Sequence, residues 1–69
     1  MAGVQVEQYV LGWHPQKGSA YRIKLAGRVL SPWISVSAAD LAALAAIFAE
    51  QPVFAHSDGS ITTGPEPVG

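Results

Sequence analysis

Basic residues gather in one stretch of the chain. Four of them lie between positions 17 and 28, namely Lys17, Arg22, Lys24 and Arg28, and they are all the lysines and arginines that the chain has. The five acidic residues are spread through the rest of the sequence. Arg22, Lys24 and Arg28 share one parity, so a strand through this segment projects them from one face.

Aromatic side chains are expected on the same face. The preceding segment supplies Tyr9, Leu11 and Trp13 at alternate positions. Cations between aromatic rings on an open sheet are typical of proteins that bind single-stranded nucleic acid, because phosphates pair with the cations and bases stack on the rings. The candidate nucleic-acid-binding residues are Arg22, Lys24, Arg28, Tyr9 and Trp13.

Two other interpretations of this face stay open. A half-exposed sheet often carries lysine and arginine as a solvated face, and tryptophan, tyrosine and arginine are also enriched in subunit interfaces. Glu7 is expected on the same face, where it would repel phosphate. Three or four cations per chain give only weak, salt-sensitive affinity for nucleic acid.

Residues for catalysis or metal binding do not form a recognisable set. His14 and His56 have no second histidine three or four positions away, and the chain has no cysteine, so no metal site and no cofactor are expected. His56, Ser57 and Asp58 are adjacent and cannot adopt the geometry of a hydrolytic triad. Asp40 and Glu50 are about 15 Å apart on the expected helix. We therefore expect no catalytic residues and no enzyme activity.

Length and composition favour a small domain that associates. The chain has 69 residues, of which 49% are hydrophobic and 13% are charged, with a formal net charge of −1. A chain this short without disulfides has a marginal core, so part of its surface is expected to be covered by another chain. Residues 1–63 are expected to form one domain, followed by a tail of glycine and proline at 64–69. No membrane span or secretory signal is recognisable, so a cytoplasmic location is expected, with no membrane partner.

The pattern of residues 4–30 predicts a long β-hairpin. Residues 4–13 and 20–30 alternate in hydrophobicity with β-branched and aromatic side chains, and residues 14–19 between them carry proline and glycine at turn spacing. If His14 faces Ser19, Gly12 pairs with Tyr21 and Tyr9 pairs with Lys24. This register places an aromatic ring opposite a strand glycine.

The rest of the chain predicts a short strand, a helix and a second hairpin. Residues 33–36 resume the strand pattern, and Trp33 is expected in the core or in an interface because tryptophan buries a large area. Ser37 and Asp40 resemble a capping box, which begins a helix over 38–51 that Pro52 ends. Residues 53–56 and 60–63 then form a shorter hairpin around Asp58-Gly59.

The expected helix has an unusual outer side. Its core side carries Leu41, Leu44, Ala45, Ile47 and Phe48. Its other side consists of Ala39, Ala42, Ala43, Ala46 and Ala49, with no charged residue between Asp40 and Glu50. Nothing protrudes from such a face, so another chain can approach closely, although alanine is also simply the best helix former. We interpret these five alanines as an oligomer interface, with a symmetric dimer favoured.

The sequence therefore predicts an α+β fold, in which a small antiparallel sheet packs on one alanine-rich helix in the order β-β-(β)-α-β-β. The leading functional hypothesis is a non-catalytic homo-oligomeric interaction module without an identifiable small-molecule substrate. The alternative is weak binding of single-stranded nucleic acid through the basic and aromatic face of the N-terminal hairpin.

Overall fold

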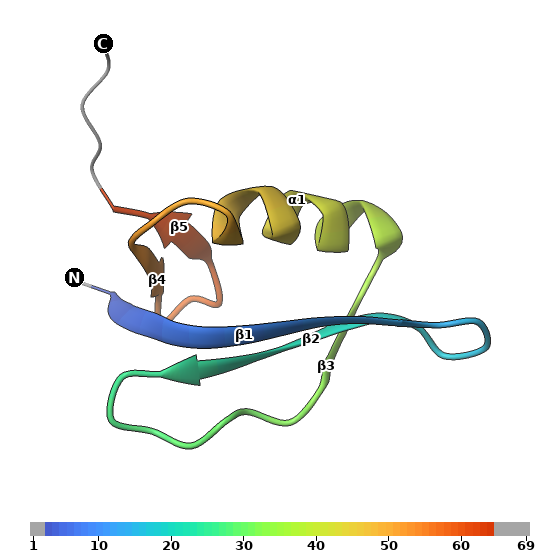
Figure 1. Cartoon of the computed structure of the whole chain (residues 1–69), viewed down its shortest axis with the longest axis horizontal. Helices are drawn as coiled ribbons and strands as arrows, with labels where there is room; N and C mark the ends of the chain where they lie inside the picture. Colours follow the sequence, from blue (N-terminus) through green and yellow to red (C-terminus); the bar gives the residue numbers. More distant parts are fainter. Residues whose placement is uncertain (1–2, 65–69) are drawn as a thin grey trace, which may run out of the picture.

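The computed structural model describes residues 3–64 and confirms the predicted α+β class and element order. In chain order the elements are β1 (Val4–His14), β2 (Gly18–Leu25), β3 (Ile34–Val36), α1 (Ala38–Phe48), β4 (Val53–Ala55) and β5 (Ile61–Thr63). The strands form one antiparallel sheet in the order β3-β2-β1-β4-β5. The helix lies along one face of this sheet (Figure 1).

The core lies between α1 and the sheet. It is small: the buried hydrophobic residues are Tyr21, Ile23, Phe48 and Val53. Partly buried hydrophobic side chains surround them. These come from all five strands, with Val36 as the contribution of β3, and from the inner side of the helix. The helix covers one face of the sheet, and no helix among the described residues covers the other. We call the face against α1 the near face and the opposite one the far face.

The hairpin of β1 and β2 is confirmed, but the predicted register is wrong by one residue. His14 faces Gly18, Gly12 faces Ala20 and Tyr9 faces Ile23. The turn residues are 15–17, and Gly18 follows them with a φ of 83°, a conformation that glycine adopts at little cost. A one-residue shift moves each side chain of β1 to the other face relative to β2. Consequently Tyr9 and Leu11 lie on the same face as Tyr21 and Ile23, where Leu11 packs against the core and Tyr9 stays 46% exposed.

The second strand ends earlier than predicted. β2 ends at Leu25, and the chain turns back there because Arg28 N–H donates to Leu25 O while Gly27 adopts a φ of 75°. Leu30 and Ser31 then run back beside β2, where Leu30 bridges Lys24. Arg28 therefore lies in a loop and not on a strand.

The helix begins where predicted and ends three residues earlier. Ser37 Oγ accepts the backbone N–H of Asp40 at 3.0 Å, which satisfies one free donor of the first turn. The last helical residue is Phe48 rather than residue 51. Pro52 disfavours helical geometry at the residue before it, so the chain leaves the helix ahead of the proline.

The second hairpin closes the fold. β4 and β5 pair around a turn in which Gly59 has a φ of 91°, as the Asp-Gly dipeptide predicts. Gly64 is buried and donates to Pro52 O at 2.9 Å, so it belongs to the body of the fold and not to the predicted tail. The rest of that tail, residues 65–69, lies outside the described residues. In the part that is described, no helix is long and apolar enough to cross a membrane.

Candidate functional site

The five residues predicted to bind nucleic acid do not share a face. Arg22 and Lys24 project from the far face, opposite Val10 and Gln8 of β1. Tyr9 projects from the near face, where its ring stacks on Phe48 of α1 with centroids 4.6 Å apart and planes at 9°. Trp13 pairs with Ser19 at the end of the hairpin and is 71% exposed. The one-residue shift therefore places Tyr9 on the other side of the sheet from Arg22 and Lys24.

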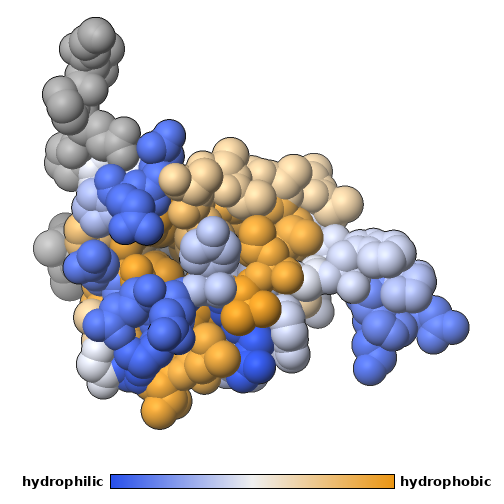
Figure 2. All heavy atoms as spheres, viewed as in Figure 1, coloured by the Kyte–Doolittle hydropathy of each residue, from blue (hydrophilic) through white to orange (hydrophobic). Residues whose placement is uncertain are grey.

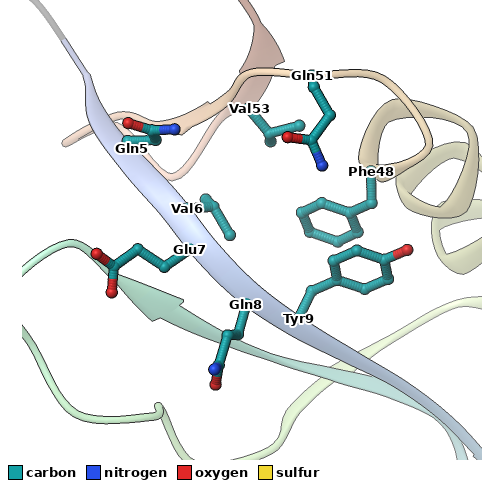
Figure 3. A pocket seen from close by; sticks show the side chains of 8 residues that line it. All are labelled: Gln5, Val6, Glu7, Gln8, Tyr9, Phe48, Gln51 and Val53. Carbon is teal, nitrogen blue, oxygen red and sulfur yellow. The ribbon is translucent and has the colours of Figure 1, made fainter.

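A bulge in β1 explains the environment of Lys24. The pairing shifts between Val6 and Gln8, so Glu7 is an extra residue of β1 and turns to the same side as Gln8 (Figure 3). Glu7 then reaches Lys24, and the two form an ion pair. The charge of Lys24 is thus partly neutralised, which leaves Arg22 as the unopposed cation at the centre of the far face.

Trp33 is the aromatic residue that covers the far face. A Cβ placed on Gly12 would lie 2.9 Å from Cη2 and Cζ3 of Trp33, so the indole rests directly against the glycine backbone. The ring is nonetheless 52% exposed, and it does not enter the core between sheet and helix. An aromatic ring covers the strand glycine, as predicted. The ring belongs to Trp33, from the segment before β3, and not to Tyr21.

Arg22 is held beside this indole. Its guanidinium carbon lies 5.4 Å from the centroid of the Trp33 ring, within the range of a cation–π contact. Its Nε donates to Ser31 O at 2.9 Å, which fixes the direction of the guanidinium. No hydrogen bond from its two terminal nitrogens to another described residue is present. These nitrogens remain able to bind an acceptor from outside.

A shallow trough of about 490 Å³ lies next to Trp33 on the far face. Its floor is a row of small residues across three strands, since Gly12 pairs with Ala20 and Ala20 pairs with Ser35. Trp33 borders the trough, and Trp13 and His14 from the end of β1 and Lys17 from the hairpin turn also line it. We call this hollow the far-face trough. It has the size of small-molecule sites, which is roughly 300–1,000 Å³.

The polar groups at the trough are donors. His14 Nδ1 accepts the backbone N–H groups of Gln16 and Lys17 at 3.1 and 3.2 Å, so the neutral ring carries its proton on Nε2. Lys17 adds an ammonium group, and Ser35 adds a hydroxyl. Of the described residues that line the trough, none is acidic. The arrangement suits an uncharged flat group with an anion attached.

A second hollow lies on the near face, between β1 and the end of α1. It has a volume of about 430 Å³ and is bordered by Tyr9, Phe48 and the amide side chain of Gln51 (Figure 3). Glu7 is the one carboxylate among the described residues that line it, and Figure 3 shows this side chain on the opposite side of β1 from the two rings. The hollow brings together no pair of groups for proton transfer.

The residues of the His56–Asp58 segment are engaged with neighbours in their own hairpin. His56 Nε2 lies 2.8 Å from Thr62 Oγ1. Asp58 accepts hydrogen bonds from Ser60 Oγ at 2.6 Å and from Ser60 N–H at 2.9 Å. The hydroxyl of Ser60 is the main cause that lowers the pKa of Asp58 below its ordinary value of 3.8. Within residues 3–64, no three histidine or acidic side chains lie close enough together to hold a metal ion.

The alanine side of α1 is exposed along the length of the helix. All five of the predicted interface residues are exposed: Ala39, Ala42, Ala43, Ala46 and Ala49. Ala45, predicted on the core side, is also exposed. Figure 2 shows the result as a continuous, moderately apolar surface over the helix. We call the five predicted residues the alanine face.

Sequence reasoning missed the role of Trp33 and Gly12. A signal was present, because a glycine inside a strand marks a place where another group approaches closely. The predicted register has a four-residue turn and therefore places Tyr21 opposite Gly12, whereas Gly12 pairs with Ala20. Gly18 at the αL position of a hairpin turn is the feature that indicates the observed register.

Comparisons with models of protein families, with curated proteins and with solved structures find no match for this chain.

Proposed function

We propose that this chain is a non-catalytic homo-oligomeric interaction module, with a dimer as its simplest form. The observation that supports this proposal is the alanine face, which is exposed over the whole helix and has no charged residue between Asp40 and Glu50. Association through this face buries methyl groups without removing any charge from water, so it avoids the largest cost of forming an interface.

The size of the alanine face limits the strength of this association. A helix of 11 residues is about 16 Å long and about 10 Å wide. Its face is therefore far smaller than the roughly 800 Å² per partner of a standard interface. Flat alanine surfaces let helix axes approach to the short end of the usual 8–10 Å range. We expect a dimer that exchanges rapidly and dissociates in the micromolar to millimolar range.

Substitution of an alanine with glutamate tests the proposal. Ala42→Glu puts a charge in the middle of the proposed contact, where its desolvation weakens association by at least about tenfold, equivalent to about 1.4 kcal/mol. Ala26→Glu is the matched control because Ala26 is an exposed alanine in the turn after β2. Light scattering coupled to size exclusion measures both. Equal association constants for Ala42→Glu and Ala26→Glu contradict a role for the alanine face.

A second candidate function is the binding of single-stranded nucleic acid by the far face. It is favoured by one specific observation, the contact of Arg22 with the exposed indole of Trp33. A cation and a ring on one open sheet face are the elements that such binding uses. Of the residues predicted from the sequence, Arg22 and Lys24 remain in this candidate site, and Trp13 lines the trough beside it. Arg28 lies outside it, in the loop after β2. Tyr9 is turned to the other face.

A further inference from the structure

We propose that the far-face trough binds one nucleotide, with the base on the small-residue floor beside Trp33 and the phosphate at Lys17. This inference rests on the second candidate function and deepens it, since it names the residues and the ligand group. It is independent of whether the chain forms a dimer.

The floor of the trough fits a flat ring. Ala20 and Ser35 are paired across β2 and β3, and neither side chain is larger than a hydroxymethyl group. They form the open part of the floor, since the edge of the Trp33 ring lies over Gly12. The indole of Trp33 beside this row supplies an aromatic contact, and stacking of a base on an aromatic side chain contributes about 1–3 kcal/mol by alanine substitution. A branched or bulky aliphatic group gains less from a flat floor, because it contacts the floor with only part of its surface.

The charges around the trough fit a phosphate. Lys17 and His14 line it, and Arg22 lies beside Trp33 with its terminal nitrogens available. The nearest carboxylate on this face belongs to Glu7, next to Gln8, and Gln8 is four residues from Gly12 along β1. Four strand residues span about 14 Å. This exceeds the Debye length of about 10 Å at 0.1 M salt, so repulsion of a phosphate by Glu7 is mostly screened.

Nuclear magnetic resonance of the isotope-labelled protein tests this placement. The probes are thymidine monophosphate, a short single-stranded oligothymidylate, thymidine without phosphate, and inorganic phosphate. We expect the first two to shift the Trp33 indole N–H and the amides of Gly12, Ala20 and Ser35, with the oligothymidylate binding more tightly. Thymidine and inorganic phosphate each lack half of the ligand, so we expect at least about tenfold weaker binding for both.

Charge reversal provides the matched variants. Lys17→Glu replaces the proposed phosphate contact in an exposed turn and is expected to weaken binding of thymidine monophosphate at least about tenfold. Arg28→Glu makes the same change in charge in a loop outside the trough, and its effect is expected to be under threefold for the mononucleotide.

The outcomes separate the two proposals. Saturable shifts at the trough that Lys17→Glu weakens and Arg28→Glu does not support the nucleotide site. If the strand binds and shifts the Trp33 indole but the two reversals weaken the mononucleotide equally, the trough is not the site and the second candidate function still stands. If the strand binds and the Trp33 indole does not shift, the strand binds away from the far face and both proposals are overturned. If neither the strand nor the mononucleotide binds at low salt, both are overturned. If the mononucleotide binds at the trough and the strand does not, the ligand is a free nucleotide and single-strand binding is wrong.

Discussion

Single residues decide what the far face presents. Gly12 lacks a Cβ, and this absence lets Cη2 and Cζ3 of the Trp33 indole lie against β1 while Arg22 contacts the ring. Three residues from three parts of the sequence are thereby fixed in one surface. If Gly12 has this role, its replacement by alanine must lower the stability of the protein when the Trp33 indole is present and raise it when the indole is absent.

We expect Gly12→Ala to destabilise the protein by about 1–3 kcal/mol, because the new methyl group would lie 2.9 Å from two ring carbons of Trp33. In the Trp33→Ala background the space is free. There the same substitution is expected to stabilise by about 0.5–1 kcal/mol, since glycine inside a strand costs that much relative to alanine. Urea denaturation of the four proteins of this cycle gives both values. A loss of stability in both backgrounds contradicts the proposed contact.

At the scale of elements, local side-chain hydrogen bonds stabilise the start of the helix and the turns of both hairpins. Ser37 caps α1, His14 accepts two backbone N–H groups in the first hairpin, and Asp58 accepts two hydrogen bonds from Ser60 in the second. The Asp58 contact is the one with a measurable pH dependence. Because the pKa of Asp58 is lowered in the folded protein, the contact stabilises the β4–β5 turn at pH values above 3.8. This contribution is lost as the pH falls through the lower folded value.

We therefore expect the Asp58 carboxyl to titrate with a midpoint below 3.8. Ser60→Ala removes the hydroxyl that makes the largest contribution, so the pKa is expected to rise toward 3.8 while the backbone N–H bond keeps part of the shift. Ser57→Ala is the control, an exposed serine of the same turn. Carbon-detected titration of the side-chain carboxyl measures all three proteins. A midpoint that Ser60→Ala leaves unchanged assigns the lowered pKa to another cause.

The elements that depend on local signals were predictable from the sequence. Ser37 and Asp40 predicted the start of α1, and Asp58-Gly59 predicted the second turn, because capping and turn geometry involve neighbours along the chain. The register of β1 with β2 was not predictable in this way, because a change of one residue in turn length moves each side chain of one strand to the other face of the sheet. The same error placed Tyr9 beside Lys24, whereas the structure places it on Phe48. The contact of Trp33 with Gly12 joins β1 to the segment before β3, a strand that is not its neighbour in the sheet. The glycine within β1 signals a close approach, but no local pattern indicates which group approaches.

At the scale of the whole molecule, the two layers leave two different surfaces exposed. The alanine face is uncharged and flat, which suits a second copy of the chain. The far face carries Arg22 and the trough, which suit an anionic group with a ring. The small core agrees with both, since only four hydrophobic residues are buried within residues 3–64. We therefore propose that the helix carries self-association and that the sheet carries ligand binding.

The central claim is that the chain associates with itself, and sedimentation equilibrium of the unmodified protein tests it most directly. Samples between about 10 μM and about 1 mM span the expected dissociation range. We predict that the average mass rises with concentration from the 7.2 kDa of one chain toward twice that value. A mass that stays at 7.2 kDa up to about 1 mM contradicts the proposed module.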